Sequence, residues 1–191
     1  MKSFDMAAIR LLDICAGLFG GLLALPIVLV AGVMVRRDSP GPALFRQVRV
    51  GRHQQPFVCY KLRTMAEGTQ AVGTHEVSAA SVTPLGRTLR RLKIDELPQL
   101  WNVLKGEMSL VGPRPCLPVQ TELVQARQAL GVYEARPGVT GRAQVIGLDM
   151  STPVELARED AIWTAHPNLK DYLRLVLMTV VGSGQGDRVR G

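Results

Sequence analysis

An uncharged apolar stretch from Ile14 to Val35 constrains this chain more than any other feature of its sequence. It is long enough to cross a bilayer as a straight helix. Pro26 lies near its middle, where a proline removes a backbone hydrogen bond and bends the helix. The basic residues that flank the stretch on its two sides are Lys2, Arg10, Arg36 and Arg37. Because both ends are positive, the positive-inside rule assigns no orientation. A single spanning helix and a helix that breaks at Pro26 and returns to the same face both remain open.

The charge balance of the chain points to anionic partners. The net charge is +7, which suits nucleic acid, anionic lipid or phosphorylated substrates. Aromatic residues make up only 5% of the chain, too few for a surface that stacks bases, so nucleic acid is not an expected partner. The three cysteines, Cys15, Cys59 and Cys116, share no metal or disulfide spacing. That pattern favours a reduced, cytoplasmic compartment.

Short strand and helix patterns follow the apolar stretch. Strands are expected over 43–50 and 57–65, and the period of two places Lys61 and Arg63 on one face of the second. Thr83, followed by a proline, is expected to cap a helix. Further helices are expected over 97–105, 118–130, 153–164 and 168–181, with a mobile loop over 66–82 and a short strand within 136–147. The wide apolar face of the last helix suits either the core or a membrane interface.

Asp95 and Glu96 lie between two of the predicted helices. An acidic residue at a helix start is often only a cap. The same position also faces free backbone N–H groups that can hold a phosphate. Carboxylates act as nucleophiles toward phosphorus, and two adjacent acids can hold one Mg²⁺ together with substrate phosphates. Asp95 and Glu96 are therefore the candidate catalytic and metal-ligating residues for phosphoryl-group chemistry.

Basic residues elsewhere in the chain can complete a pocket for phosphates. Arg114 lies in a stiff Pro-Arg-Pro turn, which presents a bidentate guanidinium at low entropic cost. Further candidates for substrate binding are Lys61, Arg63 and Arg90. Arg136 and Arg142 form a second basic loop that suits substrate binding, although a purely structural turn explains that loop equally well.

Three motifs resemble those of one known family. They are KLRTM at 61–65, IDELPQLWNVLKGEMSLVGPRP at 94–115 and RPGVTGRAQVIG at 136–147. In order and spacing they are similar to the bacterial sugar transferase family, the monotopic polyprenyl-phosphate phosphoglycosyl transferases. The resemblance extends over nearly the whole chain, and its length resembles the small form of the family that has only a catalytic core.

The resemblance implies an enzyme that moves a sugar-1-phosphate from a UDP-sugar to a polyprenyl phosphate, commonly undecaprenyl phosphate, with release of UMP. That reaction is the first membrane step of a bacterial glycoconjugate or polysaccharide pathway. Asp95 matches the residue that becomes a phospho-sugar ester, and Glu96 its partner in holding Mg²⁺. Lys61, Arg90 and Arg114 match cations of the family's motifs.

The resemblance also implies a fold and a location. The class is α+β and mostly helical, with a re-entrant membrane helix broken at Pro26 over 1–37. A compact cytoplasmic catalytic domain with short strands and interfacial amphipathic helices follows over 38–182, and then a loosely held tail over 183–191. Such a protein contacts membrane lipid at the cytoplasmic face of the bacterial inner membrane, and a homodimer remains open.

Two positions depart from the family pattern, and two other functions compete with the one implied. Leu25 stands where family members often have Ser, and Arg142 where they often have Trp. A glycosyl transferase that moves sugar without phosphate would release UDP instead of UMP. A membrane-anchored basic module without enzymatic activity would explain the charge and the anchor, but not the paired acids beside a rigid arginine.

Overall fold

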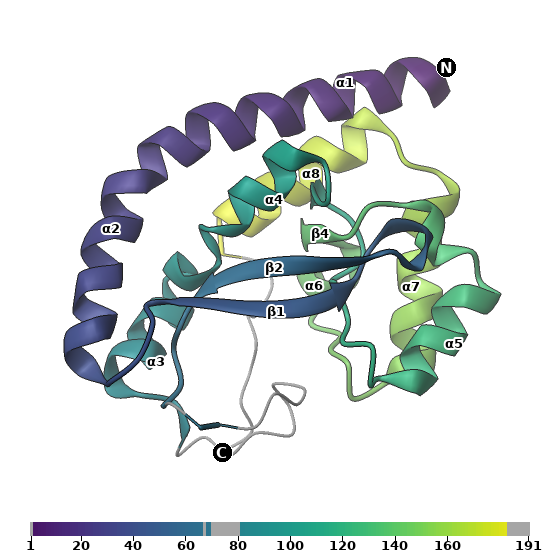
Figure 1. The fold of residues 1–191 in the computed structure, drawn as a ribbon. Coiled ribbons are helices and arrows are strands. Elements are labelled where there is room, and N and C mark those ends of the chain that lie inside the picture. The colour runs from purple at the N-terminus through teal and green to yellow at the C-terminus, as the bar shows by residue number, and fades with distance from the viewer. Residues whose placement is uncertain (1, 67, 70–80, 183–191) are drawn as a thin grey trace.

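In the computed structural model of this protein, the described residues are 2–66, 68–69 and 81–182. Figure 1 shows a long N-terminal helical segment that arches over a domain of short strands and helices. The segment consists of α1 (Lys2–Cys15), a π-helical turn (Ala16–Gly20) and α2 (Gly21–Asp38). Most of the predicted loop at 66–82 and all of the predicted tail lie outside the described residues. The α+β, mostly helical class is confirmed.

The N-terminal segment bends without being interrupted at Pro26. That residue lies inside α2, and the backbone is helical on both sides of it. The π-helical turn comes one and a half turns earlier, and Gly17 in this turn is buried. A Cβ on Gly17 would come within 3.0 Å of the Cβ of Leu104, so the glycine allows close packing. The predicted break at Pro26 is therefore wrong as an interruption of the helix, because proline and the π-turn bend the segment while preserving its helical path. Re-entry into the membrane remains a prediction.

Only one face of the N-terminal segment touches the domain. The residues of this segment that are buried against the domain are Ile9, Asp13, Gly17, Ala24, Ala31 and Val35. Residues 4–38 form one helical stretch long and apolar enough to cross a membrane. Its most apolar 18-residue window has a mean hydropathy of 2.5, yet only 17% of that window is buried. A core helix of this hydropathy would be mostly covered. The apolar surface of this helix therefore suggests membrane association.

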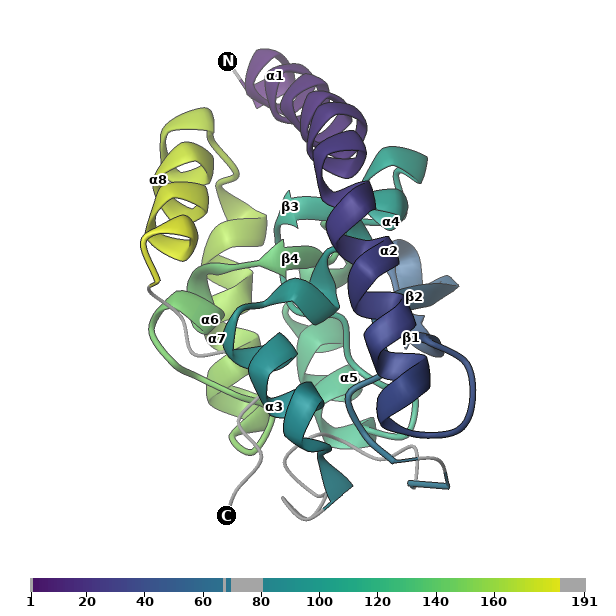
Figure 2. The ribbon, with the colours of Figure 1, turned by 90° about the vertical axis from the view of Figure 1, so that its left-hand side faces the viewer.

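Two small sheets organise the domain. An antiparallel hairpin pairs β1 (Leu44–Val50) with β2 (Pro56–Leu62), as predicted from the alternating sequence. A short parallel pair joins β3 (Ser109–Val111) to β4 (Gly138–Thr140). Figure 2 shows α2 running beside the hairpin, with α8 on the other side of the molecule.

The helices that follow the hairpin begin and end where their caps predict. The Thr83 hydroxyl accepts from the Gly86 N–H at 2.9 Å and starts α3 (Pro84–Arg91). A 3₁₀ turn (Ile94–Glu96) leads to α4 (Gln99–Lys105), which ends at Gly106 with a φ of 84°. Glycine adopts this left-handed conformation without strain, which explains why α4 ends at this residue.

The C-terminal half packs four helices and a 3₁₀ turn around the parallel strands. They are α5 (Thr121–Ala129), the 3₁₀ turn (Val132–Glu134), α6 (Arg142–Val145), α7 (Pro153–Ala165) and α8 (Leu169–Val180). Tyr172 and Leu175 of α8 are buried in the core, whereas Leu173 and Leu177 are 50% and 63% exposed. One face of α8 therefore belongs to the core, as one of the two alternatives predicted. Contact of the exposed apolar face with the membrane interface remains a prediction.

Candidate active site

The acid pair lies in the 3₁₀ turn between α3 and α4. Lys93, just before this turn, has a left-handed backbone with a φ of 56°, which reverses the chain direction after α3. Asp95 is only 6% exposed. The turn therefore carries two adjacent carboxylates into the interior of the domain, at the start of α4.

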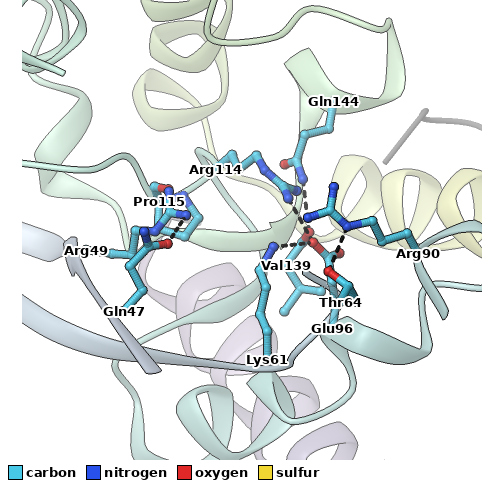
Figure 3. Close-up of polar contacts among 10 residues, drawn as sticks. All are labelled: Gln47, Arg49, Lys61, Thr64, Arg90, Glu96, Arg114, Pro115, Val139 and Gln144. Atoms are coloured by element: carbon cyan, nitrogen blue, oxygen red, sulfur yellow. Dashed lines mark hydrogen bonds and ion pairs between the residues drawn. The ribbon is translucent and has the colours of Figure 1, made fainter. Parts of the chain in front are cut away.

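Glu96 is surrounded by basic side chains from separate elements (Figure 3). Its Oε1 accepts from the Lys61 Nζ of β2 at 2.9 Å and from an Arg114 Nη2 after β3 at 2.8 Å. All three side chains are largely withdrawn from solvent. Partly buried ion pairs of this kind are less screened than surface pairs, so the three groups hold one another in a fixed arrangement. Lys61 and Arg114, predicted as substrate-binding residues, are thus neighbours in space.

Arg90 of α3 joins this group of cations. Its Nε donates to the Thr64 hydroxyl at 2.8 Å, and Figure 3 shows its guanidinium beside Glu96. The buried Nη1 of Arg90 has no hydrogen-bond partner among the described residues. An unpaired buried donor of a positive group is costly unless an anion accepts from it. Arg90 therefore has a donor available for a substrate phosphate.

Gln144 of α6 is a polar residue of the site that sequence reasoning missed. Its Nε2 donates to the Val139 carbonyl at 3.0 Å, while its buried Oε1 has no partner in the described part of the chain. An uncharged amide within the third motif gives no electrostatic signal in a sequence. The only available indication that Gln144 belongs to the site was its position shortly after β4, the strand that pairs with β3.

A cavity of about 340 Å³ opens beside Glu96 and Arg114. Its lining is polar at that end and mainly apolar elsewhere. The lining residues are Leu92, Lys93, Glu96, Leu97, Leu100, Arg114, Val139, Thr140, Gln144, Thr179 and Val180. The arrangement suits a ligand that combines a phosphate with an apolar group.

Buried contacts fix the turn that carries Arg114. A Cβ on Gly112 would come within 2.3 Å of the Arg136 carbonyl oxygen, so the backbones cross closely just before the turn. The Arg114 carbonyl accepts from an Arg127 Nη1 at 2.8 Å. Arg127 is itself held by Asp160 through two hydrogen bonds of 3.0 and 2.6 Å. The buried Arg127–Asp160 pair thus connects α5, α7 and the Arg114 turn.

Arg63 does not join the other cations of the site. Its guanidinium donates to the Ser39 hydroxyl at 2.7 Å and to the carbonyl oxygens of Ser39 and Pro42, both at 2.8 Å. The strand ends at Leu62, so the alternation that predicted a face shared with Lys61 does not extend to Arg63. These contacts favour a structural role for Arg63 at the end of α2, instead of the predicted substrate binding.

The structure separates Arg136 and Arg142, which the sequence groups in one loop. Arg136 donates to the Gly106 carbonyl at 2.9 Å, at the far end of α4 from the acid pair. Arg142 lies at the start of α6 and pairs with Glu159 of α7. Neither side chain lines the cavity beside Glu96. The predicted role of both in substrate binding receives no support from this arrangement.

Cys59 and the acidic side chains determine which nucleophiles and metal ligands the described part of the site can offer. Burial raises the pKa of the nearby Cys59 thiol, outweighing the positive Lys61, so that thiol stays protonated and unreactive. The described residues contain no group of three or more His, Cys, Asp or Glu side chains that could enclose a metal. Asp95 and Glu96 alone fit the way Mg²⁺ binds through one or two carboxylates and completes its shell with substrate phosphates.

Comparisons with known proteins agree with the arrangement of the site. The Bacterial sugar transferase family matches residues 4–185. A UDP-glucose:undecaprenyl-phosphate glucose-1-phosphate transferase of Caulobacter vibrioides is 44% identical over 180 residues, covering 87% of this chain and 67% of that protein. The uncharacterized sugar transferase EpsL of Bacillus subtilis is 44% identical over 138 residues, which cover 72% of this chain and 68% of that protein.

A third relative shows that the same sequence pattern serves more than one sugar. The undecaprenyl-phosphate galactose phosphotransferase of Salmonella typhimurium is 38% identical over 156 residues, which cover 72% of this chain and 32% of that protein. The family matches nearly all described residues, and two relatives are 44% identical to this chain. The chain therefore belongs to the bacterial sugar transferase family.

Proposed function

We propose that this protein transfers a sugar-1-phosphate from a UDP-sugar to undecaprenyl phosphate at the cytoplasmic face of the bacterial inner membrane. The observation that carries the proposal is the Glu96 carboxylate, which is held by Lys61 and Arg114 at the polar end of a mainly apolar cavity. Related proteins are named for transfer to undecaprenyl phosphate, with glucose in one case and galactose in another. The sugar of this chain is therefore left as a class, a UDP-sugar.

The reaction proceeds in two exchanges at one phosphorus. An Asp95 carboxylate oxygen attacks the phosphorus bonded to the sugar, the bond to UMP breaks, and UMP leaves with its electron pair. An oxygen of undecaprenyl phosphate then attacks the same phosphorus, which releases the Asp95 carboxylate and forms the lipid diphosphate sugar. Each step brings an anion toward an anion. Lys61, Arg90 and Arg114 offset that repulsion and stabilise the charge that develops on the phosphoryl oxygens.

Asp95 and Glu96 would hold Mg²⁺ together with the substrate diphosphate. When bound, the metal would neutralise phosphate charge and orient the diphosphate for in-line attack. Glu96 keeps Lys61 and Arg114 oriented toward the phosphates, and the apolar wall of the cavity accommodates the first isoprene units of the lipid.

Nucleotide release tests this proposal directly. Purified protein in detergent is given undecaprenyl phosphate, Mg²⁺ and a panel of UDP-sugars, and the released nucleotide is identified. UMP is expected from at least one donor, and Asp95→Asn should abolish its release with an unchanged unfolding midpoint. Glu122→Gln removes an exposed carboxylate on α5 and serves as the control with normal activity. Release of UDP would establish a glycosyl transferase instead, and full activity of Asp95→Asn would exclude Asp95 as the nucleophile.

A further inference from the structure

A second cavity lies under α1, apart from the site of the acid pair. Its volume is about 80 Å³, and it shares no lining residue with the cavity beside Glu96. Three arginines from distant parts of the chain line it, namely Arg10, Arg52 and Arg136. One water needs roughly 10–15 Å³ of such space, so the cavity has room for a phosphate group and a neighbouring hydroxyl.

The three arginines are held by backbone carbonyls, which leaves other guanidinium N–H groups available. Arg10 donates to the carbonyls of Val103 and Leu104 at 2.8 and 3.0 Å, at the end of α4. Arg136 donates through Nε to the Gly106 carbonyl in the same turn. Arg52 donates through Nε to the Glu134 carbonyl at 2.8 Å. The negative end of α4 stabilises cations at this place but does not neutralise them.

The three arginines outnumber the two acidic residues that line this cavity, Asp13 and Glu134. Among the described residues, Arg10, Arg52 and Arg136 take part in no salt bridge. Burial, and then the nearby Arg10 and Arg52, lower the pKa of Arg136, while Asp13 acts in the opposite direction. An anion with several oxygens would relieve this repulsion and accept from the remaining donors.

Asp13 supplies a complementary group in the same cavity. It is fully buried, and its Oδ1 accepts from Ser109 Oγ at 3.0 Å, the Leu110 N–H at 2.9 Å and the Tyr172 hydroxyl at 2.9 Å. Its Oδ2 is buried too and has no partner among the described residues. A buried carboxylate oxygen of this kind requires a donor, and a hydroxyl group next to a bound phosphate would provide one.

The cavity also borders apolar surface. Met6 lines the cavity and is partly exposed, and Phe4, on the same helix, is 75% exposed. These residues belong to the helical segment whose apolar surface suggests membrane association. An occupant that carries acyl chains next to its phosphate therefore fits this position better than a soluble anion.

We propose that this cavity binds the headgroup of an anionic glycerophospholipid, with Arg10, Arg52 and Arg136 on the phosphate and Asp13 Oδ2 accepting from a headgroup hydroxyl. The proposal rests on the membrane association of the proposed function but not on its chemistry. A bound headgroup here would anchor α1, the hairpin turn and the end of α4 to the membrane surface at one point.

Trp163, which is buried and lines the cavity, reports on its occupancy. In a Trp101→Phe background, Trp163 is the only tryptophan of the chain. Dihexanoyl phosphatidylglycerol, added below its micelle concentration to protein in non-ionic detergent, should change the Trp163 fluorescence saturably. Dihexanoyl phosphatidylcholine, which lacks both the net charge and the hydroxyls, should bind at least tenfold more weakly.

Arginine variants separate this site from others. Arg52→Gln and Arg136→Gln should each raise the half-saturating lipid concentration about tenfold or more, the loss expected for one charge-assisted hydrogen bond. Because Arg52 is exposed, its variant should fold normally even if Arg136→Gln does not. Arg158→Gln removes an exposed charge from α7 and should leave the titration unchanged. Arg114→Gln should abolish nucleotide release but leave lipid binding, as reported by Trp163 fluorescence, unchanged. A wrong enzymatic proposal and a wrong lipid-site proposal would therefore give different results.

Three outcomes would overturn the proposal. Inorganic phosphate that saturates the signal as tightly as the lipid would make this a site for a free anion. Equal weakening by Arg52→Gln and Arg158→Gln would indicate nonspecific charge attraction. The absence of any saturable change with phosphatidylglycerol would exclude the site.

Discussion

At the scale of single residues, Arg114 should be sensitive to a change that preserves its charge. Its Nη2 contacts Glu96 while its neighbours hold the backbone rigid, so the planar fork is presented in one orientation. Arg114→Lys keeps a cation but loses the fork, and we expect kcat to fall about 10²-fold. Steady-state UMP release checks this value. Arg158→Lys, at an exposed position of α7, is the matched control. A loss below threefold in Arg114→Lys would show that the fork geometry is unimportant.

Arg63 should affect stability much more than catalysis. Its guanidinium donates to the Ser39 and Pro42 carbonyls just after α2, so Arg63→Met leaves partly buried acceptors without these donors. We expect the free energy of unfolding to fall by about 2–3 kcal/mol. Activity measured well below the unfolding midpoint should stay within threefold of the unsubstituted protein. A tenfold drop in kcat with unchanged stability would instead restore the substrate-binding role predicted from its sequence position.

The charged residues of the site could be identified from the sequence, but which of them lie together in space could be only partly predicted. The motifs correctly indicated that Lys61 and Arg114 are close to the acid pair, because each motif is fixed by short, rigid elements. Arg136 and Arg142 were wrongly grouped, since β4 (Gly138–Thr140) runs between them and α6 begins only at Arg142. Gln144 lines the cavity, and its Oε1 has no hydrogen-bond partner among the described residues. Because its side chain carries no charge, neither composition nor spacing indicated that it belongs to the site.

At the scale of elements, the Arg127–Asp160 pair connects two helices to the Arg114 turn. Asp160→Asn leaves a buried guanidinium without its carboxylate, which should cost about 3–5 kcal/mol of unfolding free energy. The double variant Arg127→Met, Asp160→Leu removes both charges and should recover most of that stability. The Arg114 carbonyl would still lack its donor, so kcat should remain several-fold low. Chemical denaturation and UMP release together check this, and a fully active double variant would contradict the positioning role of Arg127.

Elements with local signals could be predicted better than elements that depend on distant contacts. Thr83 begins its helix as expected, because capping depends on only a few neighbouring residues. The bend near Pro26 was expected, but the preceding π-helical turn was not. Gly17 in that turn packs against Leu104, a contact between residues far apart in sequence that no local pattern encodes.

At the scale of the whole molecule, the main prediction is that the N-terminal helix enters the membrane and returns to the same side. If the helix is re-entrant, single cysteines at Lys2→Cys and Arg37→Cys should react with an impermeant maleimide from the same, cytoplasmic side. The background carries Cys15→Ala, while Cys59 and Cys116 are buried. Leu22→Cys, in the exposed apolar middle of the helix, should not react from either side. Labelling of the two end cysteines from opposite sides of membrane vesicles would establish a spanning helix.

The hydrogen bonds of Asp13 have a consequence for biosynthesis. The donors to its Oδ1 come from residues 96, 97 and 159 positions later in the chain. During translation, the apolar helix leaves the ribosome long before these donors are made. The nascent chain must therefore keep this carboxylate without its native donors, beside an insertion-prone segment, until Tyr172 is synthesised. The docking of α1 through Asp13 thus depends on residues that are made much later than the helix itself.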